Sequence, residues 1–298
     1  MKHIFIINPK AGKGKATDLI PFIYEFFRDK DEEFIIRVTE YPGHATEIAK
    51  EYSILGDNRI YSVGGDGTVN EVVNGMAGTN ASLGVIPAGS GNDFIRSIAN
   101  PSDIQDFTIR TINGEDKYID LAKANDKYFI NISSIGFDAD VAFNADKFKK
   151  VPGITGSMAY VISIIYTVIK KRISKIKIHI DDREMELKLL LAAIANGRFY
   201  GGGMLAAPDA KIDDGLFDIC LITEASRFQI LGLFPKYIKG EHGQLKEVQF
   251  LRGKKVTIES NEELRLNIDG EIFSSCTIAF EMIEKGIKVI FPKVGSIT

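Results

Sequence analysis

Strand-like and helix-like hydrophobic patterns alternate along the first part of the chain. Short apolar runs lie at Ile4–Ile7, Phe34–Thr39, Ile60–Val63 and Leu83–Pro87. Between them, apolar residues recur at the three- and four-residue spacing of amphipathic helices, as in residues 68–76. Strands that alternate with helices in this way predict an open, mainly parallel, doubly wound α/β sheet.

From about residue 117 onward the pattern changes, and strand-like runs dominate. Lys175–Ile180 and Leu264–Asp269 alternate strictly between apolar and polar residues, as half-buried strands do. Asp181-Asp182 and Asp269-Gly270 come at the ends of these runs and predict hairpin turns. The second part of the chain is therefore expected to be an antiparallel β-sandwich with helices attached.

These two patterns predict an α/β plus mainly β protein with two domains. We place the α/β domain at residues 1–120, completed by a C-terminal strand at about residues 286–298. The β-sandwich domain is placed at residues 121–285. In the α/β domain, ligands are expected at the carboxyl ends of the parallel strands.

Composition narrows the class of protein. The 298 residues are 45% hydrophobic and 26% charged, with a net charge of −3. This balance is typical of a globular protein and gives no indication of nucleic-acid binding. The two cysteines lie in strand-like apolar runs, so a disulfide framework or zinc site is not expected. The first apolar run is too short for a signal peptide, which predicts a cytoplasmic location.

The strongest chemical signal is Gly64-Gly65-Asp66-Gly67-Thr68, on a predicted strand-to-helix turn. Thr68 and Glu71 have the spacing of a capping box, which predicts a helix start near Thr68. Glycines and a helix N-terminus suit a bound phosphate. Since a carboxylate repels phosphate unless a cation lies between them, Asp66 favours a metal–nucleotide. The alternative is a tight Asp-Gly turn without a ligand.

Two further polar loops follow predicted strands. Residues 8–15 form a basic loop after the first strand, and residues 88–93 form a second glycine-rich loop with an acid. Asn8, Thr39 and Asp66 each stand at the carboxyl end of a strand, so we expect them to lie together. The first loop matches neither the P-loop nor the GxGxxG pattern, and a basic surface loop is the alternative.

The string from Gly64 to Gly75, GGDGTVNEVVNG, resembles the signature of the soluble bacterial diacylglycerol kinases and related bacterial lipid kinases. Sphingosine, ceramide and NAD kinases share its GGDGT core. The resemblance implies an ATP-dependent kinase that phosphorylates a lipid hydroxyl, converting diacylglycerol to phosphatidic acid. The alternatives are a kinase of phosphatidylglycerol or a sphingoid base, an NAD kinase, and a non-catalytic lipid-binding regulator.

The resemblance also implies site residues. It makes Glu271, in Asp269-Gly270-Glu271, the general base and Asp66 the second catalytic residue. Because these two residues come from different domains, the resemblance implies an active site in the cleft between the domains. Ser90 stands where many family members carry threonine, and it keeps the hydroxyl. The residues implied for ATP are Asn8, Pro9, Lys10, Ala11, Gly12, Thr39, Gly65, Asp66, Gly67, Thr68, Val69, Asn70, Glu71, Ser90, Asn92 and Asp93.

Two features of the second domain are read in the same way. The resemblance places Asp120 in a polar network between the nucleotide site and the second domain, with a lysine partner that the sequence does not identify. It also implies a structural Mg²⁺ held by the Asp214 side chain and the carbonyls of Lys211 and Leu216, apart from the Mg²⁺ that accompanies ATP. The alternatives are an exposed edge-strand residue at Asp120 and a simple Asp-Gly turn at Asp214.

Met158–Ile169 is an apolar helical run that is too short to span a bilayer. A buried core helix is the favoured interpretation, and a helix beside the lipid entrance is the alternative. Lys147, Lys149 and Lys150 precede this run, and Lys170-Lys171-Arg172 follows it. Such basic flanks suit anionic lipid headgroups. We therefore expect peripheral contact with the inner face of a membrane and leave the oligomeric state open, a homodimer included.

Overall fold

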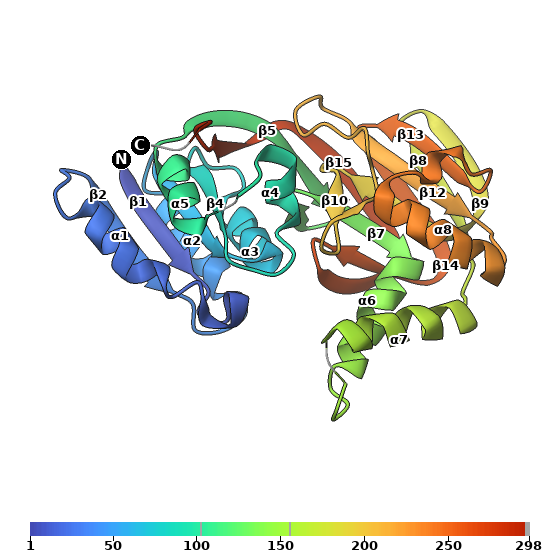
Figure 1. Cartoon of the computed structure of the whole chain (residues 1–298). Coiled ribbons are helices and arrows are strands. Elements are labelled where there is room, and N and C mark those ends of the chain that lie inside the picture. The colour runs from blue at the N-terminus through green and yellow to red at the C-terminus, as the bar shows by residue number, and fades with distance from the viewer. Residues whose placement is uncertain (102, 155, 296–298) are drawn as a thin grey trace.

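The computed structural model describes residues 1–298 apart from 102, 155 and 296–298. Figure 1 shows two halves side by side: β1 to β4 with α1 to α5 at the left, and the β-rich half at the right, with α6 and α7 below it. The strands β5 and β15 run between the halves. The predicted α/β plus β-sandwich fold is confirmed.

The first half contains a parallel sheet in the order β4-β3-β1-β2. Its strands coincide with the predicted apolar runs. The residues of β1, β3 and β4 are buried on both faces of the parallel sheet, whereas those of the edge strand β2 are only partly buried. Their bounds are β1 Lys2–Ile7, β2 Glu33–Val38, β3 Arg59–Gly64 and β4 Ser82–Pro87.

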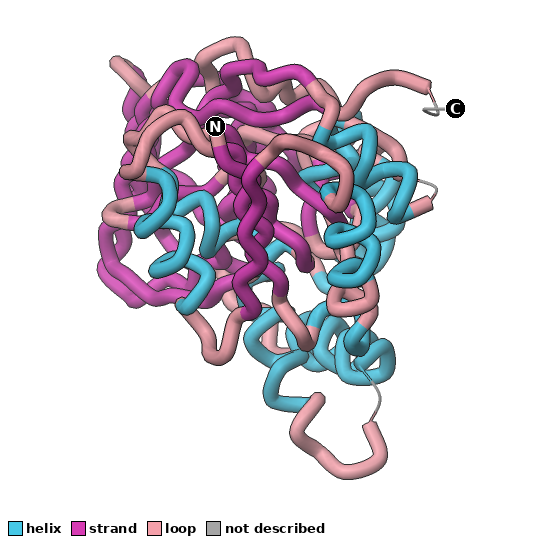
Figure 2. The backbone as a smooth tube through the Cα atoms, turned by 90° about the vertical axis from the view of Figure 1, so that its left-hand side faces the viewer, coloured by secondary structure: helices cyan, strands magenta, loops and turns pink. Residues whose placement is uncertain are grey.

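Helices cover both faces of this parallel sheet, as Figure 2 shows with the strands between them. Ile4 and Ile6 of β1 face the core under α2 and α3, whereas Phe5 and Ile7 face the core under α1. This alternation along one strand is the predicted doubly wound arrangement. The helices are α1 Leu19–Phe27, α2 His44–Ser53, α3 Asp66–Met76, α4 Asp93–Ile98 and α5 Ile104–Ile112.

The second half is built from antiparallel strands. The predicted hairpin turns at Asp181-Asp182 and Asp269-Gly270 join β8 to β9 and β14 to β15. The strands are β5 Glu115–Ala124, β6 Lys127–Phe129, β7 Ile132–Gly136, β8 Ser174–Ile180, β9 Arg183–Ala195, β10 Phe199–Tyr200, β11 Met204–Leu205, β12 Phe217–Thr223, β13 Val248–Gly253, β14 Lys255–Ile268 and β15 Glu271–Phe291.

Two apolar layers lie on opposite sides of these strands. Inside the sandwich, the buried rings of Phe129, Phe217 and Phe280 pack on one another, with centroids 6.2 to 6.4 Å apart. A second core lies beneath the helices α6 Phe137–Phe148, α7 Gly156–Ile169 and α8 Arg227–Lys239. Aromatic packing of this kind adds to the stabilisation from simple area burial.

The long strand β15 belongs to both halves. It begins opposite Ile268 of β14 and ends beside β5, with Lys288 and Val289 also pairing in parallel with Ser82 and Leu83 of β4. One hydrogen-bonded sheet therefore runs through the molecule. The domain boundaries given above stay a prediction.

The helix α7 differs from the favoured interpretation of residues 158–169. Its small and polar side chains, Ala159, Ser163 and Thr167, are buried, whereas Val161 and Ile165 are more than half exposed. Ser163 donates a hydrogen bond to the Val141 carbonyl of α6. The prediction of a buried core helix was therefore wrong, because α7 is buried on one face only. Small residues let it approach α6 closely, and Tyr160, Ile164 and Val168 pack on the core beneath it, whereas Val161, Ile165 and Ile169 face outward.

Candidate functional site

Three loops meet at the carboxyl ends of β1, β3 and β4. A Cβ atom on Gly89 would lie 2.4 Å from Gly65 Cα, and one on Gly12 would lie 2.3 Å from the Ala88 carbonyl oxygen. Contacts this short exclude a side chain at Gly12 and Gly89, so these two positions require glycine. The sequence-predicted loops therefore form one continuous surface of backbone at the start of α3.

The first loop is tied to α3 by a side chain. Asn8 Nδ2 donates to Thr68 Oγ1 at 3.1 Å, and Asn8 Oδ1 accepts from Lys10 N at 3.0 Å. A hollow of about 160 Å³ lies beside this contact. Six of the residues implied for ATP line it: Asn8, Pro9, Lys10, Thr39, Thr68 and Glu71.

The predicted capping box between Thr68 and Glu71 is wrong. The helix α3 begins at Asp66 and has Gly65 as its N-cap, without a side-chain cap. Glu71 instead accepts hydrogen bonds from Gly43 N at 2.9 Å and from Ala45 N at 3.1 Å. Its carboxylate thus caps the N-terminus of α2, where the free backbone N–H groups stabilise a negative charge.

Asp66 and Asp93 connect the second and third loops. Asp66 Oδ1 accepts from Asp93 N at 2.6 Å, and Asp93 Oδ2 accepts from Gly202 N at 2.8 Å. The buried Asp93 Oδ1 has no hydrogen-bond partner among the described residues, and Arg96 Nε lies 3.8 Å from it. Burial, with the nearby Asp66 charge, raises the pKa of Asp93 to about 6.

A cleft of about 380 Å³ opens between the two halves beside these acids. Asp66, Asp93 and Ser90 line it from the first half, and Asp269 and Gly270 line it from the β14–β15 hairpin. Burial raises the pKa of Asp269 to about 6, against hydrogen bonds from the backbone amides of residues 130–132. Several carboxylates facing one cleft favour a cationic ligand or a metal-bound anion.

Glu271 is the first residue of β15 and follows the turn residue Gly270. Its side chain is partly buried, and it is not among the residues that line the cleft. The hairpin itself is fixed, because Asp269 accepts from Ile130 N at 2.9 Å and from Ile132 N at 3.0 Å. The structure therefore holds Glu271 next to the cleft on a rigid turn, and its catalytic role stays a prediction.

Other residues implied for ATP have different surroundings. Asn70 is buried and donates to the Tyr128 carbonyl at 3.2 Å, away from the three loops. Asn92 adopts a left-handed conformation and bonds the backbone of Gly89 through both side-chain atoms. Asn92 thus shapes the third loop, and Val69 lines the cleft. The role of each in binding ATP stays a prediction.

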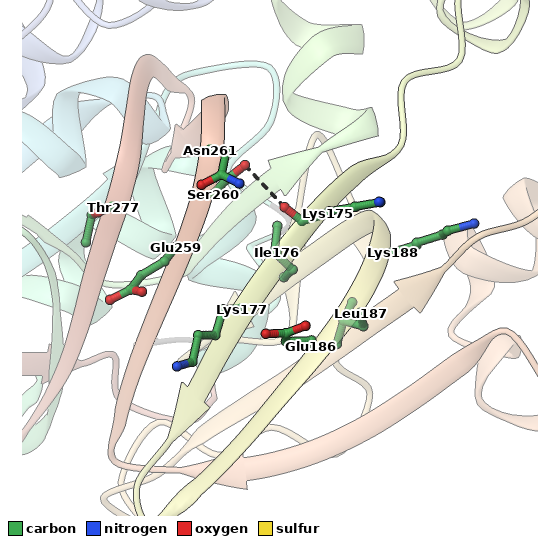
Figure 3. A pocket seen from close by; sticks show the side chains of 10 residues that line it. All are labelled: Lys175, Ile176, Lys177, Glu186, Leu187, Lys188, Glu259, Ser260, Asn261 and Thr277. Carbon is green, nitrogen blue, oxygen red and sulfur yellow. Dashed lines mark hydrogen bonds between the residues drawn. The ribbon is translucent and has the colours of Figure 1, made fainter.

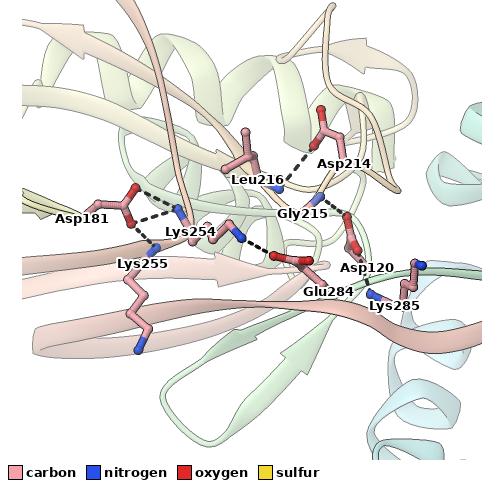
Figure 4. Close-up of polar contacts among 9 residues, drawn as sticks. All are labelled: Asp120, Asp181, Asp214, Gly215, Leu216, Lys254, Lys255, Glu284 and Lys285. Atoms are coloured by element: carbon pink, nitrogen blue, oxygen red, sulfur yellow. Dashed lines mark hydrogen bonds and ion pairs between the residues drawn. The ribbon is translucent and has the colours of Figure 1, made fainter.

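Asp120 lies where the two halves join (Figure 4). It is 1% exposed, which excludes an exposed edge-strand residue. Asp120 Oδ2 accepts from Gly215 N at 2.6 Å and Oδ1 accepts from Lys285 N at 2.8 Å. The carboxylate is thus bonded to two backbone amides, one of which belongs to a lysine residue.

The residues implied for a structural Mg²⁺ lie next to this junction. Asp214 Oδ1 accepts from Leu216 N at 3.3 Å, and Oδ2 is paired with Arg252, which also lies 3.4 Å from Asp218 Oδ1. The described residues contain no cluster of three His, Cys, Asp or Glu side chains suited to a metal. Arg252 already supplies a positive charge to both carboxylates, and the role of Lys211, Asp214 and Leu216 in holding Mg²⁺ stays a prediction.

Two features that matter here were not predicted. The triple-glycine segment 201–203 supplies a backbone amide to Asp93, which only the fold brings together. Asp138 lies at the start of α6, and both of its carboxyl oxygens are buried without a hydrogen-bond partner among the described residues. Its position after Gly136-Phe137, at the end of a strand-like run, was the only sequence signal for it.

A hollow of about 720 Å³ lies elsewhere. Figure 3 shows it on the face of β8, β9 and β14, where Lys175, Lys177 and Lys188 alternate with Glu186 and Glu259. None of the predicted site residues lines it. Mixed charges on an open sheet face are typical of a solvated surface.

No helix within the described residues combines the length and the apolar character needed to cross a bilayer.

Comparison of the sequence with known protein families finds two matching domains. Residues 2–124 match the diacylglycerol kinase catalytic domain, and residues 131–291 match the YegS C-terminal NAD kinase beta sandwich-like domain. Diacylglycerol kinase of Bacillus subtilis (strain 168) is 29% identical over 98% of this chain and 97% of its own. That of Staphylococcus epidermidis (strain ATCC 12228 / FDA PCI 1200) is 30% identical over 97% of this chain and 91% of its own.

Solved structures agree with this fold. One from Bacillus anthracis str. Sterne has a TM-score of 0.78 and 29% identity, with 97% of both chains covered. A second, titled as a diacylglycerol kinase from the same organism, has a TM-score of 0.71 and 24% identity, with 97% of this chain and 96% of that chain covered. The family models and the full-length relatives together show that the chain belongs to the diacylglycerol kinase family and is a lipid kinase.

Proposed function

We propose that this lipid kinase transfers the γ-phosphate of ATP to the free hydroxyl of diacylglycerol and forms phosphatidic acid. The observation that carries the proposal is the junction of three glycine loops with Asp66 and Asp93, directly beside the cleft between the halves. Backbone N–H groups at the start of α3 suit the ATP phosphates. The names of the full-length relatives support diacylglycerol as the acceptor.

In this proposal the protein acts mainly by positioning. The loops hold the nucleotide, and Glu271 accepts the proton of the lipid hydroxyl as its oxygen bonds to the γ-phosphorus and the bond to ADP breaks. Mg²⁺, when bound with the nucleotide, neutralises phosphate charge. The unpartnered Asp93 Oδ1 and the neighbouring Asp66 are the side chains that suit it.

The test is phosphate transfer from radiolabelled ATP to a panel of acceptors. We expect labelled phosphatidic acid from diacylglycerol, and little product from phosphatidylglycerol, sphingosine or NAD. A clear preference for another lipid alcohol contradicts the substrate but keeps the kinase. Product formed only from NAD, or no product from any acceptor, contradicts the proposal.

We also propose that the enzyme reaches its lipid by peripheral contact through α7. Val161 and Ile165 form an apolar outer face, and the exposed Lys149, Lys150 and Lys170 lie at its two ends. Each basic side chain contributes about 1 kcal/mol near an anionic surface. Co-sedimentation with vesicles should rise with anionic lipid and fall with salt. Binding that is indifferent to both contradicts this contact.

A further inference from the structure

One lysine faces the cleft between the two halves. The residues that line the cleft include three acids, Asp66, Asp93 and Asp269. Among the lining residues that the structure describes, Lys149 is the one with a cationic side chain. It comes from the end of α6, whereas the acids come from the starts of α3 and α4 and from the β14–β15 hairpin. The cleft therefore presents an ammonium group as well as carboxylates to whatever binds in it.

The fold fixes the backbone from which this side chain extends. Lys149 is the C-cap of α6, and its N–H donates to the Ala145 carbonyl at 2.9 Å. The helix is attached to the sheet, because Arg265 of β14 pairs with Asp140 of α6. A cation at a helix C-terminus is also stabilised by the helix dipole. The ammonium group therefore starts from a defined point at the edge of the cleft.

The partner of Lys149 in this structure is a surface acid. Lys149 Nζ lies 2.8 Å from Asp146 Oδ1, three residues earlier in α6, and both side chains are more than half exposed. Such exposed pairs stabilise a protein little, because water solvates both charges and the two side chains lose rotamer freedom. The exchange of Asp146 for an anion in the cleft therefore costs little free energy.

The proposed reaction determines which anion Lys149 meets. The cleft extends from Asp66 and Ser90 of the nucleotide loops to Gly270, the residue before Glu271. The γ-phosphate lies between the nucleotide and the acceptor hydroxyl during transfer, and its charge has to be neutralised against the neighbouring carboxylates. A neutral acceptor such as diacylglycerol offers no charge to an ammonium group. The γ-phosphate is therefore the anion that suits Lys149.

We infer that Lys149 is a further catalytic residue, which leaves Asp146 and pairs with an oxygen of the γ-phosphate while this group passes from ADP to the acceptor. The inference rests on the proposed function. Lys149 exchanges no proton and forms no covalent bond in this step, and it acts by its charge alone. Because the γ-phosphate is the group that it recognises, a side chain of the second half distinguishes ATP from ADP.

The experiment measures nucleotide binding without lipid, so that the membrane contact proposed for Lys149 does not contribute. Calorimetry with Mg²⁺ compares ADP with the non-hydrolysable analogue β,γ-imido-ATP. We expect Lys149→Gln to bind the analogue about tenfold more weakly, the factor for one charge-assisted hydrogen bond, and ADP as before. Lys149→Arg keeps the charge and should retain most of the affinity. The exposed Lys246 gives the control Lys246→Gln, with wild-type affinity for both nucleotides.

Turnover gives a second measurement. At saturating lipid in mixed micelles, kcat/KM for ATP should fall about tenfold or more in Lys149→Gln, because the contact to the γ-phosphate is lost. Asp146→Asn removes the surface partner and should keep the wild-type preference for the analogue over ADP. If Asp146→Asn instead reproduces the loss seen in Lys149→Gln, the ion pair within α6 is responsible, and the inference is overturned.

Two binding results also overturn the inference. Equal weakening of ADP and the analogue in Lys149→Gln, or no change in either, means that the side chain does not recognise the γ-phosphate. Failure of the proposed function is distinguishable from this, because the wild type then transfers no phosphate from ATP to any lipid. Phosphate transfer by the wild type together with an unchanged nucleotide preference in Lys149→Gln contradicts the inference alone.

Discussion

Two groups of aspartates, one in the cleft and one at the junction of the two halves, differ in whether their carboxylate oxygens have hydrogen-bond partners. In the cleft, Asp93 keeps one buried oxygen without a hydrogen bond and lies beside Asp66, and its pKa is raised. At the junction, both oxygens of Asp120 and of Asp214 have protein partners. Full pairing holds structure together, whereas Asp93 keeps one oxygen that accepts no hydrogen bond and that a ligand can use. The four predictions below test this difference.

The largest effect is expected at Asp66. Asp66→Ala should lower kcat by about 10³-fold or more, because it removes a charge that suits the metal–nucleotide from the centre of the three loops. The measurement is phosphate transfer by a variant with a wild-type melting curve. The exposed Asp57 provides a matched control, and Asp57→Ala should be fully active. A folded Asp66→Ala enzyme of near wild-type rate would remove the cleft acids from the mechanism.

At Glu271 the expected loss is about a hundredfold, at the lower end of general-base contributions. Glu271→Gln keeps the size of the side chain but accepts the hydroxyl proton poorly. ATP affinity should survive, because the nucleotide loops belong to the other half. Measuring kcat and ATP binding on one preparation separates a base from a positioning residue. The exposed Glu263, in the neighbouring strand, gives the control Glu263→Gln.

Asp120 should affect stability rather than turnover. Asp120→Ala leaves the buried amides of Gly215 and Lys285 without an acceptor, which costs about 3 kcal/mol of unfolding free energy. Urea unfolding measures this loss directly. Asp120→Asn retains one acceptor and should lose less. Unchanged stability together with lost activity would place Asp120 with the cleft acids instead.

The smallest effect concerns the structural Mg²⁺ proposed at Asp214. Added Mg²⁺ should raise the melting temperature of the wild type by a few degrees, and Asp214→Ala should abolish that shift. Since Arg252 pairs with the same carboxylate, Arg252→Gln should enlarge the shift by removing a competing cation. An identical shift in all three proteins places any Mg²⁺ elsewhere.

Local patterns predicted much of the fold. The apolar runs at β1 to β4 and the alternation at β8 are set by burial on one or both faces, so the sequence alone reveals them. The failures arose from tertiary contacts. Glu71 has the spacing of a capping box, but the amides at the start of α2 compete for its carboxylate. The sequence of α7 showed that the helix is apolar, but it did not show which face packs on the protein. The close approach to α6, marked by the Ser163–Val141 hydrogen bond, determines that face.

The candidate site also has features that the sequence predicts and features that it does not. The glycine loops were predictable, because tight turns and phosphate contact need glycine at fixed positions in the sequence. The bond from Gly202 to Asp93 joins segments 109 residues apart, and the burial of Asp138 depends on three helices packing around it. Neither leaves a local pattern. The Arg252–Asp214 pair is likewise a product of β12 and β13 lying side by side.

The path of β15 has a consequence for synthesis. One edge of β4 stays open until Lys288 and Val289 pair with it, although the rest of the parallel sheet lies within the first 87 residues. On the ribosome, the nucleotide-binding half must therefore wait for the translation of some two hundred further residues before its sheet is complete. During that interval the bare β4 edge is open to pairing with other chains, so slow translation or a chaperone at this stage should govern the yield of active enzyme.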